Sequence, residues 1–331
     1  KLVKFMKEDK FLGKEGSTFL MRTDDALKAK RVLLVGLGKK ESFTLESVRQ
    51  ASATALNVAK NLEIKSVVST VYGVGVGELS VTQCTQAVVE GARLAFYSFD
   101  SYKKVSKKTS LERMDLFILP EQWREAQKGA QTGELMARGT LLARDLVNTP
   151  AQDMHPQTLV EQAKALAKGK ECIQVKVYNT QALTRMGAGG ILGVAQGSDY
   201  PAYLVHMVYK PKKATKKRVA LVGKAVTFDS GGLSLKPADA MMSMKIDMGG
   251  AAAVIGTFSA IDELSPSCEV HGIFAAVENM PSGKAMRPGD ILTAMNKKTI
   301  EVLNTDAEGR LTLADALTFA LKQKPQAIID L

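Results

Sequence analysis

Three segments of the chain concentrate charged side chains among glycines and apolar residues. Residues 224–232 (KAVTFDSGG), 244–250 (MKIDMGG) and 304–310 (NTDAEGR) together contain four carboxylates, two lysines and one arginine. Isolated charges are costly in apolar surroundings. The pattern therefore predicts that these segments meet around bound metal ions, and that the ions serve a reaction.

The carboxylates of Asp229, Asp247, Asp306 and Glu308 set the charge of the predicted site. At separations of about 5 Å, each pair would repel by roughly 3 kcal/mol at an effective dielectric constant of about 20. All the pairs together would rival the stability of a whole domain. Either some carboxylates are protonated or cations neutralise them. Two divalent ions match the four carboxylates in charge and would form a two-metal hydrolytic site.

The identity of the metal follows from the ligand types. Oxygen ligands without His or Cys favour Mn²⁺ or Mg²⁺, with Zn²⁺ as an alternative. The three histidines, His155, His206 and His271, show no HExxH spacing, so a zinc site built from histidine is not expected. His206 and His271 alternate with apolar residues, and we expect them to be half-buried, satisfied side chains.

The spacing of Asp306, Glu308 and Arg310 suggests one shared face. Residues at i, i+2 and i+4 of an extended segment point the same way, so two carboxylates and a guanidinium would enter one space. A helix is expected to follow directly, with Thr312 as its N-cap and Asp315 as the acidic N3 partner. The alternative is a surface turn with a weak Asp–Arg pair.

Lys224 and Asp229 are five residues apart, which in a straight strand would place them on opposite faces. We therefore expect residues 227–232 to leave the strand, with Gly231 and Gly232 providing the conformational freedom. Asp247 precedes two glycines that would let the next helix pack closely. Taken alone, each of these fragments could be purely structural.

Strands and helices alternate along the whole chain, which predicts an α/β protein. We expect an N-terminal α/β domain (1–125), a linker helix (126–150) and an α/β catalytic domain (151–331) with a mainly parallel central sheet. In such sheets the chemistry gathers beyond the carboxyl ends of the strands. The predicted strands are 31–36, 65–72, 114–119, 173–178, 202–209, 219–223 and 270–277, and the predicted helices are 42–60, 80–98, 120–147, 156–167 and 249–263.

The composition is that of a soluble globular protein, with 45% hydrophobic and 24% charged residues among 331. No apolar run is long enough to cross a bilayer, so no membrane contact is expected. The chain starts without Met and ends inside a predicted strand, so we expect a fragment that lacks residues at both ends, with the catalytic domain incomplete at its C-terminus. Cys84, Cys172 and Cys268 show no CxxC spacing and are expected to be reduced thiols of a cytoplasmic protein.

The net charge of +11 is concentrated in a few places. Solvated loops explain such clusters best, and contact with a polyanion is the alternative. A DNA-binding accessory protein is accordingly the second functional hypothesis, with the loop 210–218 (KPKKATKKR) as its contact surface. A smaller basic set comprises Lys103, Lys104, Lys107 and Lys108.

Five longer motifs extend this picture beyond single residues. From about residue 142 to the end they resemble, in order and spacing, the leucyl aminopeptidase (cytosol aminopeptidase) family of two-metal exopeptidases. The part before them is similar to that family only in its general α/β layout. The motifs are residues 142–153 (LARDLVNTPAQD), 222–236 (VGKAVTFDSGGLSLK), 244–250 (MKIDMGG), 278–291 (ENMPSGKAMRPGDI) and 304–316 (NTDAEGRLTLADA).

The resemblance implies a role for each metal ligand. Asp229 and Glu308 would each contact both metals. Asp247 and the amine of Lys224 would complete the tighter site, and Asp306 the more exchangeable one. Lysine binds a metal only after losing its proton, which a neighbouring dication makes easier.

The resemblance also implies an aminopeptidase mechanism. A hydroxide bridging the two metals would attack the first peptide carbonyl, and Lys236 would stabilise the oxyanion. Arg310 would hold a bicarbonate ion that moves the proton. The free amino terminus of the peptide would bind one metal, with Leu or another apolar residue preferred at that end. The family further implies a homohexamer for the full-length protein.

Overall fold

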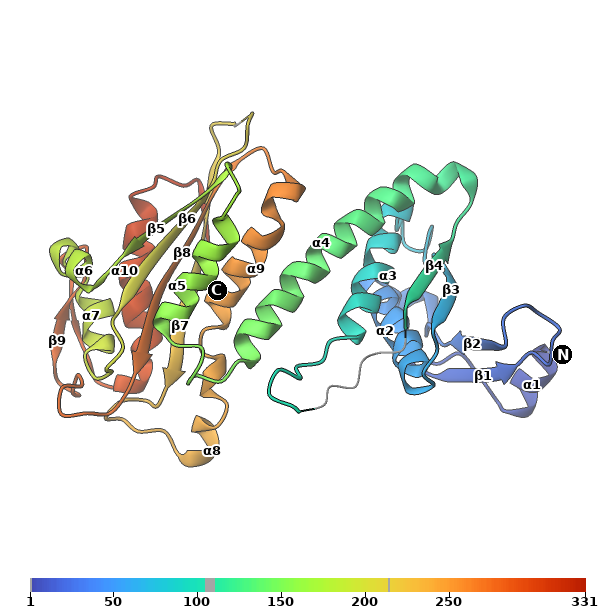
Figure 1. Ribbon diagram of the computed structural model, residues 1–331, viewed down its shortest axis with the longest axis horizontal. Helices are drawn as coiled ribbons and strands as arrows, with labels where there is room; N and C mark the ends of the chain where they lie inside the picture. Colours follow the sequence, from blue (N-terminus) through green and yellow to red (C-terminus); the bar gives the residue numbers. More distant parts are fainter. Residues whose placement is uncertain (1, 105–110, 214) are drawn as a thin grey trace. The chain divides into compact units, whose positions relative to one another are not determined.

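The computed structural model describes residues 2–104, 111–213 and 215–331 (Figure 1). The chain forms two compact units, Lys1–Ala137 and Arg138–Leu331. The helix α4 (Trp123–Asn148) contains the boundary between them. It ends two residues before Pro150, as expected from the restriction that proline places on the residue before it.

The N-terminal unit combines two small sheets with helices. β1 and β2 pair antiparallel, and β3 and β4 pair parallel. A capping box starts α3, because the Ser80 hydroxyl accepts a hydrogen bond from the Gln83 amide at 3.2 Å. The elements are α1 (Leu2–Glu8), β1 (Thr18–Arg22), β2 (Arg31–Val35), η1 (Lys40–Ser42), α2 (Leu45–Asn61), β3 (Ser66–Thr70), α3 (Val81–Ala95), β4 (Arg113–Phe117) and η2 (Pro120–Gln122).

The second unit is built on a five-stranded sheet with the order β11-β7-β8-β6-β5. β11 and β8 both run parallel to β7, whereas β6 is antiparallel to both of its neighbours. Only β6 therefore runs against the other strands, and the expected mainly parallel sheet is confirmed. The strands are β5 (Ile173–Tyr178), β6 (Tyr203–Tyr209), β7 (Arg218–Asp229), β8 (Glu269–Asn279) and β11 (Ala327–Asp330).

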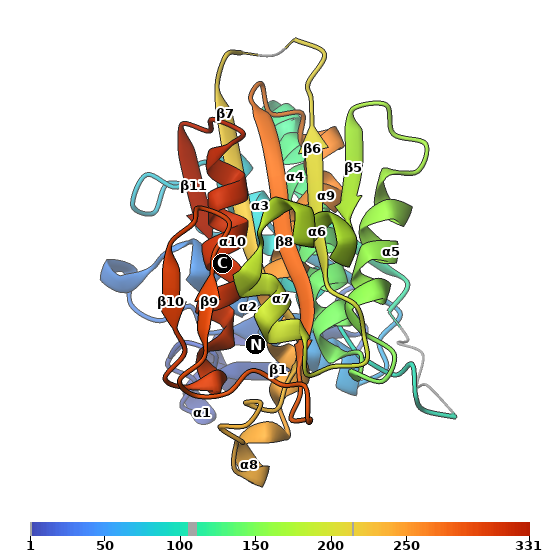
Figure 2. The same cartoon turned by 90° about the vertical axis from the view of Figure 1, so that its left-hand side faces the viewer.

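Helices cover both faces of this sheet (Figures 1 and 2). Successive apolar residues of the strands point to opposite faces of the sheet and pack into two separate hydrophobic cores. One core lies between the sheet and helices α5 and α9, and the other lies between the sheet and helices α6, α7 and α10. The remaining pieces are short. The elements are α5 (Pro156–Ala167), α6 (Thr180–Met186), α7 (Gly189–Ala195), α8 (Ala238–Met241), η3 (Met244–Ile246), α9 (Gly249–Leu264), the antiparallel pair β9 (Ile291–Thr293) and β10 (Thr299–Glu301), η4 (Thr305–Ala307) and α10 (Glu308–Leu321).

β7 continues further than the sequence predicts. It reaches Asp229, so the expectation that residues 227–232 leave the strand is wrong for the first three of them. The register shifts between Val226 and Asp229: Lys224 pairs with Ala275 and Asp229 with Asn279. Five steps along β7 therefore match four along β8, which is the signature of a β-bulge. The extra residue cancels the odd spacing and returns Asp229 to the face of the sheet that Lys224 occupies.

The histidines of the sheet are more buried than expected. His206 is 8% exposed and His271 is 4% exposed, and their rings share a hydrogen bond of 2.9 Å between Nε2 and Nδ1. Cys84 is buried, whereas Cys172 and Cys268 are half-buried, and all of them are free thiols. Within the described residues, no helix combines the length and the apolar character that a membrane span requires.

Candidate metal centre

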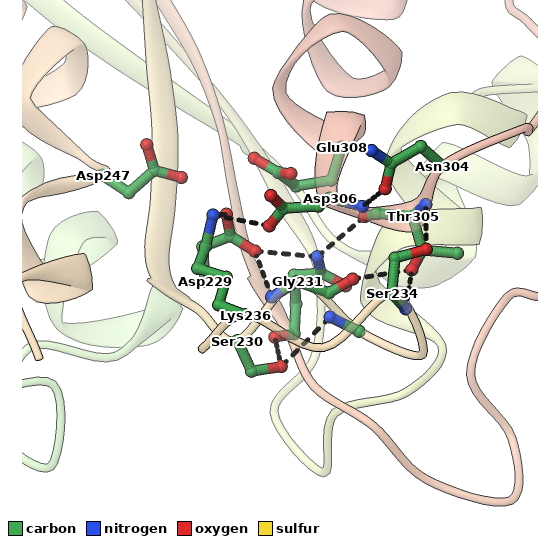
Figure 3. A network of polar contacts seen from close by, with 12 residues as sticks. Asp229, Ser230, Gly231, Ser234, Lys236, Asp247, Asn304, Thr305, Asp306 and Glu308 are labelled. Carbon is green, nitrogen blue, oxygen red and sulfur yellow. Dashed lines mark hydrogen bonds and ion pairs between the residues drawn. The ribbon is translucent and has the colours of Figure 1, made fainter. Parts of the chain in front are cut away.

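The charged segments meet at the carboxyl ends of β7 and β8, where an α/β sheet is expected to carry its chemistry. Asp229 is the last residue of β7. The carboxylates of Asp229, Asp306 and Glu308 offer oxygens that all lie within 4.8 Å of one another. Figure 3 shows these three side chains in one space, with Asp247 to one side. Asp229 and Glu308 are almost fully buried, at 2% and 1% exposure.

Two lysines connect the carboxylates. Lys224 Nζ lies 2.7 Å from Glu308 Oε1 and 2.8 Å from Asp247 Oδ1, so Asp247 joins the cluster through this amine. Lys236 Nζ lies 3.0 Å from Asp229 Oδ2 and 2.5 Å from Asp306 Oδ1. The structure thus brings together six of the seven side chains singled out in the sequence.

The electrostatics of the cluster follow from burial and pairing. Burial disfavours the charged form of Lys224, but hydrogen bonds and attraction from Asp247 and Glu308 outweigh burial and raise its pKa. The same balance raises the pKa of Lys236 between Asp306 and Asp229. Burial raises the pKa of Asp247 to about 7, although Lys224 opposes this shift. A cation that takes Lys224 as a ligand must therefore displace a firmly held proton.

Unpartnered oxygens show that this cluster suits divalent cations. Asp247 Oδ2 and Glu308 Oε2 are buried and have no hydrogen-bond partner among the described residues. Buried oxygens of proteins are usually satisfied. Carboxylate oxygens are the ligands that hard divalent cations take, and the negative charge of the cluster favours them further. The residues present therefore fit a metal centre.

Arg310 is the side chain that the structure does not bring into the cluster. It is exposed, and among the described residues it makes no ion pair with the carboxylates. The expected extended segment is wrong, because η4 covers Thr305–Ala307 and α10 begins at Glu308. In a helix, two residues turn the side chain by roughly 200°, so Arg310 faces away from Glu308.

The predicted helix cap is also wrong. α10 begins at Glu308, so Thr312 lies inside the helix and its hydroxyl donates to the Gly309 carbonyl at 3.0 Å. Asp315 is fully buried and accepts hydrogen bonds from the amides of Ile191 at 3.0 Å and Met295 at 2.6 Å. Burial raises the pKa of Asp315. This carboxylate ties α10 to α7 and to the segment after β9.

Two residues of the site were missed in the sequence. Asn279, at the end of β8, donates a hydrogen bond to Asp229. Gly309 leaves space for Lys224, because a β carbon there would lie 2.7 Å from Lys224 Cε and 2.8 Å from its Nζ. Both lie within the motifs that carry the family resemblance, but neither has a charge that would have drawn attention.

The basic loop lies away from this cluster. It joins the end of β6 to the start of β7, whereas Asp229 ends β7. A strand rises about 3.3 Å per residue, so the length of β7 separates them by roughly 35 Å. Lys107 and Lys108 lie outside the described residues. The exposed basic residues of the loop are Lys210, Lys212, Lys213, Lys216, Lys217 and Arg218.

The sheet, its two helical layers and the lysine-bridged carboxylates define an α/β protein with a candidate centre for divalent cations. Comparison with known proteins identifies its family. Residues 141–331 match the "Cytosol aminopeptidase family, catalytic domain", and residues 1–106 match the "Cytosol aminopeptidase family, N-terminal domain". The chain belongs to the cytosol aminopeptidase family, as the sequence motifs predicted.

Individual relatives agree with this assignment. A "Probable cytosol aminopeptidase" of Alkaliphilus oremlandii is 41% identical over 335 residues, covering 100% of this chain and 66% of that protein. The solved structure "Bottromycin maturation enzyme BotP in complex with Mn" is 34% identical with a TM-score of 0.86, covering 98% of this chain and 68% of the other. A mutant of tomato leucine aminopeptidase is 37% identical with a TM-score of 0.86, covering 99% and 62%. The chain thus spans 66% of the length of the curated relative.

Proposed function

We propose that the whole protein is a metal-dependent aminopeptidase that hydrolyses the first peptide bond of peptides. The observation that carries this proposal is the cluster of Asp229, Asp306 and Glu308 at the carboxyl edge of the sheet, together with the buried, unpartnered oxygens Glu308 Oε2 and Asp247 Oδ2. Membership in the cytosol aminopeptidase family supports the same reaction class.

The residues of the cluster would hold two divalent cations. Asp229 and Glu308 would contact both, Asp247 with neutral Lys224 would complete the tighter site, and Asp306 the more exchangeable one. We favour Mn²⁺, because the ligands are oxygen-rich and a similar solved structure is titled as a complex with Mn. Zn²⁺ and Mg²⁺ are the alternatives. When bound, such ions polarise a carbonyl and lower the pKa of water.

Two cationic side chains would act on the substrate. The Lys236 ammonium would donate a hydrogen bond to the oxygen of the peptide carbonyl as negative charge develops there. Its pairing with Asp229 and Asp306 holds it at the cluster. Arg310, at the exposed start of α10, would hold a bicarbonate ion that accepts and returns the proton.

Substrate preference, assembly and location complete the proposal. We expect peptides with leucine or another apolar N-terminal residue, a homohexamer of the full-length protein, and a cytoplasmic location. The free amino terminus of the peptide would be recognised at the metal centre, which restricts cleavage to the first bond.

The direct test is peptidase activity of the full-length protein with leucine p-nitroanilide and added Mn²⁺. Glu308→Gln removes the charge of a cluster carboxylate without changing its size, and it should reduce kcat/KM by at least about 10³-fold. Glu301→Gln is the matched control, because Glu301 is exposed on β10 outside the cluster. An inactive wild-type protein, or an active Glu308→Gln variant, would contradict the proposal.

DNA binding is a second candidate, supported by the exposed lysines of the loop between β6 and β7. Its residues do not overlap with the metal cluster, so the two functions are compatible. In gel-shift titrations, the logarithm of the binding constant should fall with the logarithm of salt concentration, and neutralising three loop lysines should reduce that slope by about 3. A slope near zero would refute DNA binding. The loop variant combines Lys212→Gln, Lys213→Gln and Lys216→Gln, and its control combines Lys164→Gln, Lys168→Gln and Lys284→Gln.

A further inference from the structure

The last residues of β7 and β8 form an unexpected pair. The bulge in β7 places Asp229 opposite Asn279, whereas an unbroken register would place it opposite the following residue, Met280. Asn279 is 2% exposed, so its side chain is almost completely shielded from bulk water. An uncharged amide therefore adjoins one of the most buried carboxylates of the metal cluster.

Both donors of this amide are used. Asn279 Nδ2 donates to Asp229 Oδ1 at 2.8 Å and to the main-chain oxygen of Thr305 at 3.0 Å. The Gly231 amide also donates to Asp229 Oδ1, at 2.9 Å. Two donors thus hold one oxygen of Asp229, and the other oxygen faces Lys236 (Figure 3). The rotation of the carboxylate is thereby restricted.

The main chain of Asn279 and the segment that its amide contacts are both held in place. The main-chain oxygen of Asn279 accepts hydrogen bonds from the Ser230 amide at 3.0 Å and the Ser230 hydroxyl at 2.8 Å. Thr305 is fixed in turn, because its hydroxyl donates to the Gly231 carbonyl at 2.6 Å and accepts from the Ser234 amide at 2.7 Å. Asn279 therefore connects the loop after β7 to the segment that carries Asp306 and Glu308.

Asparagine suits this position because of its chemistry. It donates two hydrogen bonds and carries no charge, so it orients a carboxylate without neutralising it. A lysine would compete with metal ions for Asp229, and an aspartate would repel it. Partners of this kind, one step removed from a metal, orient the ligands and tune affinity.

We propose that Asn279 is a positioning residue of the metal centre: its amide fixes the Asp229 carboxylate and ties it to the Thr305 segment, so that ligands from β7 and from the start of α10 are set for cation binding. This inference rests on the proposed function, since it requires that the cluster binds divalent cations. The competing explanation is that the amide only stabilises the fold.

Mn²⁺ titration of the full-length protein tests this proposal, with free Mn²⁺ measured by electron paramagnetic resonance. Asn279→Ala should raise the dissociation constant of Mn²⁺ about 10- to 100-fold, the usual cost of removing such a partner. Asn279→Leu keeps the number and branching of the side-chain heavy atoms, removes the same donors and should give the same result. Asn296→Ala is the control, because Asn296 is exposed in the same unit. The Mn²⁺ dissociation constant of this variant should equal that of the wild type.

The unfolding temperature without metal, measured in parallel, separates the two explanations. A lower unfolding temperature with an unchanged Mn²⁺ dissociation constant would show a purely structural amide and overturn the proposal. Failure of both Asn279 variants to fold would do the same. A wild-type protein that binds no Mn²⁺ would instead refute the metal centre itself, and the inference with it.

Discussion

Lys224 reaches Glu308 only because Gly309 has no side chain. A β carbon on Gly309 would lie 2.8 Å from Lys224 Nζ, the atom that is 2.7 Å from Glu308 Oε1. The glycine thus lies in the first turn of α10, next to the carboxylate that the lysine contacts. β7, which carries Lys224, and α10, which carries Gly309, approach each other closely at this point. The approach is possible because residue 309 has no methyl group.

Gly309→Ala should therefore impair the metal centre despite favouring the helix. Alanine in a helix is more stable than glycine by about 1 kcal/mol, so the fold should survive. The displaced Lys224 amine should lower kcat/KM of the full-length protein by about 10²-fold, as expected for a displacement of about 1 Å. Gly283→Ala, where a β carbon meets nothing within 4 Å, is the matched control. Equal activity of the two variants would contradict this prediction.

Lys236 should matter more for turnover than for substrate binding. Lys236→Met removes the ammonium proposed to stabilise the developing oxyanion, and kcat should fall by about 10²- to 10³-fold with KM within a few-fold of the wild type. Steady-state kinetics with leucine p-nitroanilide measures both constants. Lys284→Met, at an exposed position of the same unit, should leave them unchanged. A change confined to KM would assign Lys236 to ground-state binding instead.

Asp315 should contribute to stability rather than to chemistry. Its buried carboxylate accepts hydrogen bonds from Ile191 and Met295, and charged acceptors of this kind contribute roughly 1.5–3 kcal/mol each. Asp315→Asn keeps one acceptor oxygen and should reduce the free energy of unfolding by about 2 kcal/mol, measured by denaturant titration. Asp239→Asn, at an exposed position in α8, should cause no change.

The buried histidine pair should make stability depend on pH. Burial, followed by the charge of His271, lowers the pKa of His206 to about 4, and burial also lowers the pKa of His271. The unfolded chain, with an ordinary histidine pKa of about 6.5, then binds more protons than the folded chain below that pH. Stability is full above about pH 6.5 and falls toward pH 4, with a loss of about 2 kcal/mol at pH 5 from His206 alone.

A titration of unfolding free energy at pH 7 and pH 5 checks this histidine effect. His206→Gln keeps a donor toward His271 Nδ1 but cannot be protonated, so its loss of stability between the two pH values should be smaller by about 2 kcal/mol. His155→Gln is a control, because His155 is half-buried and stacks on the Tyr200 ring rather than on a second histidine. Identical pH dependence of wild type and His206→Gln would refute the assignment.

Elements with strong local signals could be predicted closely from the sequence. The helix at Pro156–Ala167 and the strand at Ile173–Tyr178 have the expected bounds, since proline starts the former and apolar alternation marks the latter. β7 was predicted too short, because the bulge that extends it depends on pairing with β8. The start of α10 was placed too late for a similar reason, since Glu308 is held by Lys224 from another strand.

The residue types of the candidate metal centre were determined by the sequence alone. Carboxylates and lysines in glycine-rich, apolar segments have few stable arrangements other than mutual neutralisation or cation binding. The tertiary structure decided which of these side chains meet. It brings Lys236 and Asp247 into the cluster and leaves Arg310 exposed. It also places two uncharged residues, Asn279 and Gly309, against the cluster. The physical reason is that the register of β7 with β8, the start of α10 and the close approach of Gly309 to Lys224 all depend on contacts between segments far apart in the chain. Charge and spacing within one segment do not encode such contacts.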